Sequence, residues 1–283
     1  MILATTKSVV DAHKAELENV KLTATAFNNL KSDLDAIFIR QQFDRFQQAM
    51  DALILDDAYK TPELVDLLKE ISISAKKIDK LNTEQSELQN QIVNITNSVL
   101  FYKDGDIKKA IEILATVTDT SIHKHRVLYA SYNALIVRAT RANNQQEKSE
   151  YIQKAKYHAG ESYKIGAKVN KSSVTSKVNY ATALLRSGNQ DDLENALKLL
   201  LEAKKDAPLL SVIPYNIAVC HTITKQFNKA FDSLDEAKSR GDFSTENDIQ
   251  FFMNDPDFND LRNAAASNPI YQERLNKLLK ISQ

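Results

Sequence analysis

Glycine and proline are scarce in this chain, and their scarcity constrains the fold more than any other feature. The 283 residues contain 5 glycines and 5 prolines, and neither residue occurs in 1–61 or in 63–104. An all-β fold needs many tight turns, which depend on Gly, Asn-Gly or Pro. The two runs are instead rich in Ala, Leu, Lys, Glu and Gln, which favour helix. The sequence therefore predicts an all-α fold.

The charged residues balance, since Lys+Arg is 37, Asp+Glu is 37 and the formal net charge is zero. Proteins that bind nucleic acids usually carry a basic excess, which displaces counterions from phosphates. We therefore expect no nucleic-acid partner. A net charge near zero also gives little repulsion between copies, so it does not oppose self-association.

The single cysteine, Cys220, cannot form an internal disulfide, which suits a reducing compartment. Residues 1–7 do not have a basic segment followed by an apolar run, so no signal peptide is expected. No stretch of about 18 apolar residues occurs, so no membrane span is expected either. Together these features predict a cytoplasmic protein.

The N-terminal third predicts long helices. Residues 8–56 carry apolar side chains three and four apart, and Thr61-Pro62-Glu63 is a helix-start signal. A heptad-like seam follows, with one irregular step between Ile78 and Leu81. Its members are Leu64, Leu68, Ile71, Ala75, Ile78, Leu81, Gln85, Leu88, Ile92, Ile95 and Val99. We predict a helical hairpin or coiled-coil-like region over 1–91, whose helices pair within the chain or with a second copy.

From about residue 92 the pattern changes to short helix pairs, and about four pairs are expected. The segments 100–114 and 180–200 each read as helix, Gly turn, helix, and 216–234 repeats the pattern without a glycine. A longer pair is expected at about 125–142 and 145–167. Small residues recur where the two helices of a pair would cross: Ser98, Ala110, Ala181, Ala196, Ala218 and Ala230.

These segments resemble tetratricopeptide (TPR) repeats, because Ala218, Ala230, Leu234 and Ala237 keep the family spacing. Residues 254–262 resemble the capping segment that closes many bacterial TPR arrays. The resemblance covers about 92–283. It implies an α-solenoid with a C-terminal cap that holds a protein or peptide partner.

The resemblance also implies the partner-binding residues, because one face of the first helix of each TPR repeat lines the groove. In the third and fourth pairs these are Asn179, Thr182, Arg186, Tyr215, Asn216, Val219 and Thr222. In the second pair, Tyr132 and Asn133 are candidates for an aromatic and polar groove, or alternatively for packing between repeats. Asn179 and Asn216 match positions where the family often uses Asn to hold a peptide backbone.

No motif for catalysis or cofactor binding was found: there is no glycine-rich phosphate loop, no GxSxG and no HExxH. His123 and His125 are two residues apart, so they do not share a helix face, and no cysteine or carboxylate cluster completes a metal site. The sequence therefore predicts no catalytic, cofactor-binding or metal-binding residues.

The favoured function is a non-catalytic scaffold or adaptor that binds a partner segment in the groove. A self-assembling structural subunit, paired through residues 8–93, is an alternative, and so is a regulatory protein that responds to a peptide. An all-α enzyme is the least favoured. A fold by itself does not establish function, and the identity of the partner stays open.

Overall fold

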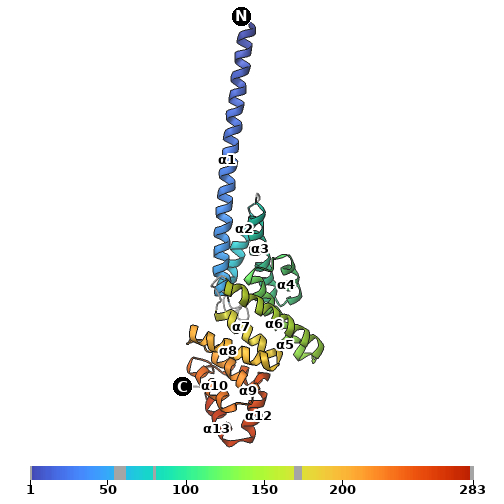
Figure 1. Cartoon of the computed structure of the whole chain (residues 1–283), viewed down its shortest axis with the longest axis vertical. Coiled ribbons are helices and arrows are strands. Elements are labelled where there is room, and N and C mark those ends of the chain that lie inside the picture. Colours follow the sequence, from blue (N-terminus) through green and yellow to red (C-terminus); the bar gives the residue numbers. More distant parts are fainter. Residues whose placement is uncertain (1, 54–61, 79–80, 169–173, 281–283) are drawn as a thin grey trace. The chain divides into compact units, whose positions relative to one another are not determined.

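A computed structural model of the chain describes residues 2–53, 62–78, 81–168 and 174–280 (Figure 1). Over these ranges it consists of 13 α-helices and two 3₁₀ turns, with no strand, which confirms the all-α prediction. The helices pack mainly on their neighbours in sequence order, as in an α-solenoid. The chain divides into two compact units, Met1–Thr118 and Asp119–Gln283.

The first unit contains α1 (Ile2–Ala52), α2 (Pro62–Lys76), α3 (Thr83–Lys103), α4 (Ile107–Ile113) and the 3₁₀ turn η2 (Leu114–Thr116). The C-terminal part of α1 packs on both α2 and α3. There Ile39, Phe46 and Met50 are fully buried. This part of the N-terminal region therefore pairs within the chain.

The predicted seam over 64–99 does not form one helix, because α2 ends at Lys76 and α3 begins at Thr83. Asn82 and Gln85 cap the start of α3 reciprocally, each side chain accepting a hydrogen bond from the other residue's backbone N–H. Gln89 Nε2 donates to the carbonyls of Ala75 and Ile78 at the end of α2, at 2.8 and 3.1 Å. The irregular step between Ile78 and Leu81 lies at this break. The second half of the predicted hairpin therefore consists of two helices, α2 and α3.

The boundary predicted between residues 91 and 92 falls inside α3, which continues to Lys103 and pairs with α4. The first of the four predicted helix pairs thus belongs to the same compact unit as the N-terminal helices. The assignment of residues 92–118 to a repeat domain stays a prediction.

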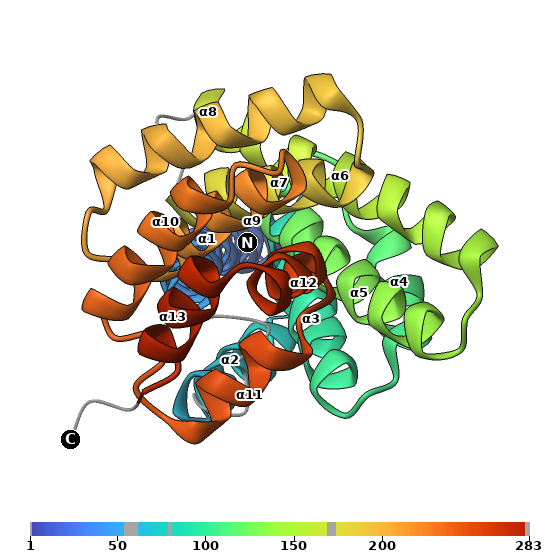
Figure 2. The same cartoon turned by 90° about the horizontal axis from the view of Figure 1, so that it is seen from below.

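The second unit contains the other three predicted pairs and the C-terminal segment. The pairs are α5 (Ile122–Arg141) with α6 (Gln145–Lys168), α7 (Val174–Ser187) with α8 (Gln190–Asp206), and α9 (Val212–Ile223) with α10 (Phe227–Ser239). They follow one another in order (Figure 2). The C-terminal segment is α11 (Glu246–Asn254), η3 (Pro256–Phe258), α12 (Asn259–Ser267) and α13 (Pro269–Leu278). Helices α12 and α13 pack on the last pair and bury Leu261, Ala265 and Leu278.

The small residues predicted at the helix crossings are all fully buried. They are Ser98, Ala110, Ala181, Ala196, Ala218 and Ala230. At the first crossing, Ser98 Oγ donates a hydrogen bond to the carbonyl of Ala110 at 2.6 Å, so α3 and the start of α4 approach closely. A small side chain at each of these positions is what allows the close approach.

The four helix pairs share one kind of turn. Between their two helices stands a residue with positive φ: Gly105 (82°), Asn143 (54°), Gly188 (74°) and Lys225 (57°). In each turn the backbone N–H of that residue bonds to the carbonyl three residues earlier. Each of these residues ends a helix in the left-handed backbone conformation, which glycine adopts most easily and asparagine next. The predicted Gly turns are confirmed, and Asn143 and Lys225 replace glycine in the other two.

The residue after each of these four positions immediately precedes the second helix of its pair, and in three of the pairs it caps that helix. Asp106, Asn144 and Asn189 each accept a hydrogen bond in their side chains from the backbone N–H three residues later. Each satisfies one of the orphan donors at a helix N-terminus. The chain therefore reverses in a similar way in successive pairs.

Candidate partner-binding face

The predicted partner-binding residues lie on the first helix of three successive pairs in the second unit. Helix α5 carries Tyr132 and Asn133, helix α7 carries Asn179, Thr182 and Arg186, and helix α9 carries Tyr215, Asn216, Val219 and Thr222. Three contacts between side chains link these odd-numbered helices to one another and to the segment after α11.

The first contact joins α5 to α7. Arg186 Nη1 donates a hydrogen bond to Asn133 Oδ1 at 2.5 Å, and both side chains are half-buried. A hydrogen bond from a charged donor is stronger than one between neutral groups. The guanidinium is therefore held beside α5 while part of it stays exposed.

The second contact joins α7 to α9. Thr182 Oγ1 lies 3.5 Å from Asn216 Oδ1, at the outer limit for a hydrogen bond. Each residue also bonds its own helix, because Thr182 Oγ1 donates to the carbonyl of Val178 and Asn216 Nδ2 donates to that of Val212, both at 2.9 Å. Packing rather than a strong bond thus aligns these two side chains.

The third contact joins α9 to the segment after α11. Tyr215 OH donates to Asp255 Oδ2 at 2.8 Å, and the Tyr215 ring meets the ring of Phe258 edge-on, with centroids 5.2 Å apart. Burial, and then the negative charge of Asp255, raise the pKa of the Tyr215 phenol. The phenol therefore acts as a neutral donor that fixes the C-terminal segment against α9.

Not all the predicted residues reach the surface. Val219 and Thr222 are 2% and 1% exposed, and Thr222 Oγ1 donates to the carbonyl of Ala218 at 2.9 Å. Tyr132 is 8% exposed and stacks on His158, with ring centroids 5.6 Å apart and an interplanar angle of 1°. Tyr132 therefore packs between helices, which is the alternative to its predicted place in a partner-binding groove.

The half-buried members form what we call the odd-helix face: Asn133, Asn179, Thr182, Arg186 and Tyr215. All five have polar groups, and they come from α5, α7 and α9 in turn. Asn216 lies between Thr182 and the backbone of α9 and is 9% exposed. The odd-helix face therefore offers donors and acceptors at several points along successive helices.

Two carboxyl groups, those of Asp255 and Asp257, lie at the start of the 3₁₀ turn η3. Asp255 caps this turn, because its Oδ1 accepts from the backbone N–H of Asp257 at 3.0 Å. Burial, and then the charge of Asp255, raise the pKa of Asp257, while the positive charges of Arg186 and Lys148 oppose the rise. The odd-helix face thus has charges of both signs within reach. No local pattern indicates this, since the charge of Arg186 on α7 comes near Asp257 only in the folded chain.

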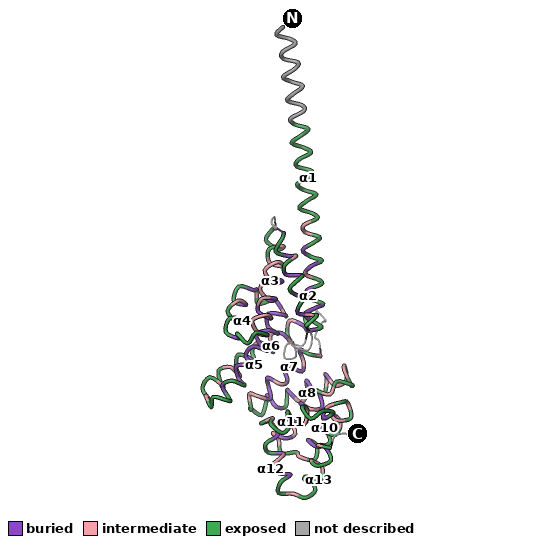
Figure 3. The backbone as a smooth tube through the Cα atoms, turned by 180° about the vertical axis from the view of Figure 1, so that it is seen from behind, coloured by how far each residue is buried: buried purple, intermediate pink, exposed green. Residues whose placement is uncertain are grey.

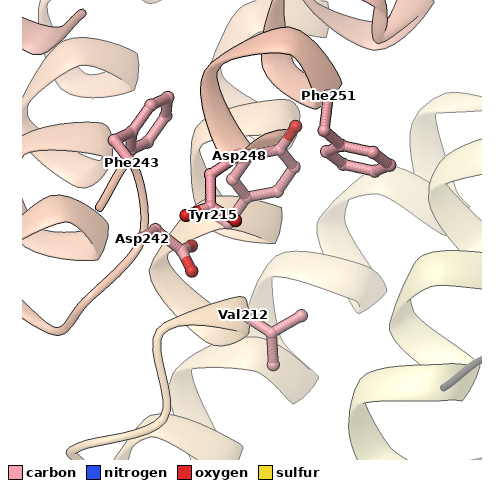
Figure 4. A pocket seen from close by; sticks show the side chains of 6 residues that line it. All are labelled: Val212, Tyr215, Asp242, Phe243, Asp248 and Phe251. Atoms are coloured by element: carbon pink, nitrogen blue, oxygen red, sulfur yellow. The ribbon is translucent and has the colours of Figure 1, made fainter. Parts of the chain in front are cut away.

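A pocket of about 180 Å³ adjoins Tyr215 and was not predicted (Figure 4). Its walls are Val212 and Tyr215 of α9, Asp242 and Phe243 of the loop before α11, and Asp248 and Phe251 of α11. Figure 4 shows the rings of Phe243 and Phe251 on either side of Tyr215 and Asp248. Phe251 is 65% exposed, although its ring centroid lies 6.1 Å from that of Tyr215. The pocket therefore combines aromatic walls with two carboxyl groups.

The two carboxyl groups of the pocket differ in environment. Ser211 Oγ donates to Asp242 Oδ1 at 2.8 Å, but burial, and also the charge of Asp248, raise the pKa of Asp242. Burial opposes ionisation of Asp248 as well, yet hydrogen bonds from Thr245 and Ser244 lower its pKa. A positively charged group with an apolar stem suits such a pocket, because aromatic faces and carboxylates both attract cations.

A histidine pair lies between α5 and α6, where His125 Nδ1 is 2.9 Å from His158 Nδ1. His125 Nε2 lies 2.9 Å from the carbonyl of Asp119, which can only accept, so this nitrogen donates. His125 Nδ1 then accepts from His158 when both rings are neutral. Burial, followed by His125 and Lys124, lowers the pKa of His158 to about 4. This contact joins α5 to α6, the two helices of the second pair.

Metal ligands and the cysteine give no further site in the described part of the chain. No group of three or more His, Cys, Asp or Glu residues there is arranged to hold a metal ion. Cys220 is buried, and burial raises the pKa of its thiol to about 12. Its thiol is therefore protonated at neutral pH and packs as a small apolar group.

No protein-family model matches the sequence, and no curated protein matches it. The likeness to TPR proteins therefore stays a prediction. Among the described residues, no helix has the length and apolar character needed to cross a membrane.

Proposed function

We propose that this chain is a non-catalytic scaffold or adaptor that binds a segment of a partner protein along the odd-helix face. One observation carries the proposal: the contacts Asn133–Arg186 and Thr182–Asn216 link the first helices of three successive pairs, and Tyr215–Asp255 continues the series to the segment after α11. Membership of the TPR family is part of the proposal, supported by the spacing and the shared turn. So is a cytoplasmic location, supported by the single buried thiol of Cys220.

The chemistry of the odd-helix face suits an extended or helical segment. Arg186 presents a planar fork of donors, of which one N–H bonds Asn133. The half-buried amide of Asn179 can donate to and accept from a peptide backbone at once. Such groups would fix the register of a bound segment.

The pocket beside Tyr215 supplies the anchor. We expect it to take a lysine or arginine side chain of the partner, because Asp242 and Asp248 attract the charge and the rings of Tyr215 and Phe251 cover the stem. A few buried anchors usually carry most of the binding free energy of an interface. A single basic residue would thus contribute strongly to the affinity of the segment.

The even-numbered helices have a different surface, which favours the odd-helix face as the binding site. Successive even helices are joined by ion pairs: Lys156 of α6 with Asp192 of α8, and Lys204 of α8 with Glu236 of α10 at 2.7 Å. Exposed Lys198 and Lys229 lie on α8 and α10. The charges of these ion pairs already neutralise one another, so they are less available to a partner than the odd-helix face is.

Affinity capture from a lysate of the native cells, with the full chain as bait, tests the proposal. The face variant Asn179→Ala/Arg186→Glu changes two half-buried positions on α7. The control variant Lys198→Glu/Lys229→Glu changes two exposed positions on even helices. We expect a partner that wild type and control retain and that the face variant loses. Equal recovery with all three baits, or recovery of the chain alone, would overturn the proposal.

A further inference from the structure

The described N-terminal part of α1 has large apolar side chains that nothing in its unit covers. Over residues 18–38 they are exposed by between 41 and 66% (Figure 3). By contrast, Ile39 and the buried residues after it pack on α2 and α3. A contiguous exposed apolar surface of this size marks an interaction site in soluble proteins.

Six of these side chains share one side of the helix, which we call the α1 stripe: Val20, Phe27, Leu30, Leu34, Ile37 and Phe38. At about 100° per residue they lie within a stripe about 100° wide. With Thr23, five of them keep steps of three and four: Val20, Thr23, Phe27, Leu30, Leu34 and Ile37. Alternating steps of three and four are the seam of a coiled coil, in which each helix offers its partner the same pattern.

We propose that the α1 stripe pairs with the same stripe of a second copy of this chain. Burying six large apolar side chains on each of two helices would remove on the order of 1,000 Å² or more from water, which reaches the lower end of stable specific interfaces. A seam that repeats every seven residues is self-complementary, as a two-fold interface requires. The zero net charge of the chain leaves this association unopposed.

The charges around the α1 stripe favour a second copy over a lipid surface. Residues 18–38 contain two basic residues, Lys21 and Lys31, against three acidic ones, Glu18, Asp33 and Asp35. Helices that lie on anionic membranes carry a polar side rich in Lys and Arg. Mixed charges beside an apolar seam are instead usual in coiled coils.

The pairing extends the proposed function without depending on it, because the α1 stripe and the odd-helix face belong to different units. A dimer would present two odd-helix faces, so a partner with two binding segments would bind with raised avidity. Loss of the dimer would leave binding of a single segment unchanged.

Sedimentation equilibrium of the full chain tests the pairing. The stripe variant Phe27→Glu/Leu34→Glu places two carboxylates seven residues apart in the seam. The control variant Thr25→Glu/Ser32→Glu places two carboxylates with the same spacing on the other side of the helix, at exposed positions. Circular dichroism melting of each variant verifies that the helices remain folded.

We expect wild type and control to have twice the chain mass of 31.9 kDa at micromolar concentrations, and the stripe variant to have the single-chain mass. A monomeric wild type would overturn the pairing. So would a stripe variant that stays dimeric. A wild type that is monomeric alone but sediments with phosphatidylcholine–phosphatidylserine vesicles would reassign the α1 stripe to a membrane surface.

Discussion

Arg186 of α7 donates a hydrogen bond from Nη1 to Oδ1 of Asn133 on α5 at 2.5 Å, so the first helices of two successive pairs are joined by side chains 53 positions apart. Both side chains are half-buried. They stabilise the fold and remain accessible to a partner at the same time.

A double-mutant cycle of Asn133→Ala and Arg186→Ala should therefore show coupling. We expect an interaction free energy of about 1 kcal/mol, since a hydrogen bond from a charged group in a half-buried site has that order of magnitude. Urea unfolding of the four proteins measures it. Strictly additive effects of the two changes would show that the contact contributes nothing to stability.

The shared turn predicts opposite effects at two positions. Lys225 has φ 57°, where a side chain costs free energy, so Lys225→Gly should stabilise the chain by roughly 0.5–1 kcal/mol. Gly188 has φ 74°, and a Cβ there would meet no atom within 4 Å. Gly188→Ala should therefore destabilise by about 1 kcal/mol through backbone strain alone. Thermal melting of both variants measures whether each change stabilises or destabilises the chain. Changes in the same direction would contradict a common turn.

The crossing of α9 and α10 should not tolerate a larger side chain. Ala230 of α10 is fully buried, as is Ala218 of α9, and the two helices pack on each other, so Ala230→Leu should overpack the crossing and cost roughly 1–3 kcal/mol. Ala266→Leu on α12 is the control, because Ala266 is exposed. Chemical unfolding compares the two. An unchanged midpoint for Ala230→Leu would mean that the two helices do not cross at this alanine.

The histidine pair predicts a loss of stability in acid. Burial and the neighbouring His125 lower the pKa of His158 to about 4, below its ordinary value of 6.5. Between these values the unfolded chain binds a proton that the folded chain excludes, so stability falls as pH drops from about 6.5 to about 4. After allowance for its partial exposure, His158 should account for roughly 1–2 kcal/mol of that fall.

The variant His158→Gln isolates this contribution, since the other titrating groups are common to both proteins. The difference in unfolding free energy between wild type and variant should change by that amount across the interval and be constant above about pH 7. Urea unfolding at pH 4.5, 5.5, 6.5 and 7.5 measures it. A difference that does not vary with pH would exclude His158 as the source.

Much of the fold could be predicted because residues close in sequence determine it. The Gly turns at Gly105 and Gly188 and the small residues at the crossings depend on residues close in sequence. The turns at Asn143 and Lys225 were not recognised as the same geometry, because neither residue is a glycine. The break between α2 and α3 was not predicted. Gln89 donates hydrogen bonds to two carbonyls at the end of α2, and the sequence pattern of a helix does not indicate such a contact.

The candidate site could be predicted only in part, for a physical reason. Helical spacing indicates which side chains share a side of one helix, and it placed Arg186 and Thr182 on α7 and Tyr215 on α9. Spacing cannot show which side chains meet across helices. The contacts Asn133–Arg186 and Tyr215–Asp255 and the pocket with Asp242 all depend on tertiary packing. Spacing also failed to show that Val219 and Thr222 are buried.

A fluorescence anisotropy titration with peptides selected from a random displayed library on the full chain tests binding along the odd-helix face. We compare wild type with Arg186→Glu on the odd-helix face, with Asp242→Asn in the pocket, and with the Lys198→Glu/Lys229→Glu control. We expect the selected peptides to contain a Lys or Arg and to bind wild type and control alike. They should bind both site variants at least about tenfold more weakly, equivalent to about 1.4 kcal/mol. Peptides that bind all four proteins with the same affinity would contradict binding along the odd-helix face.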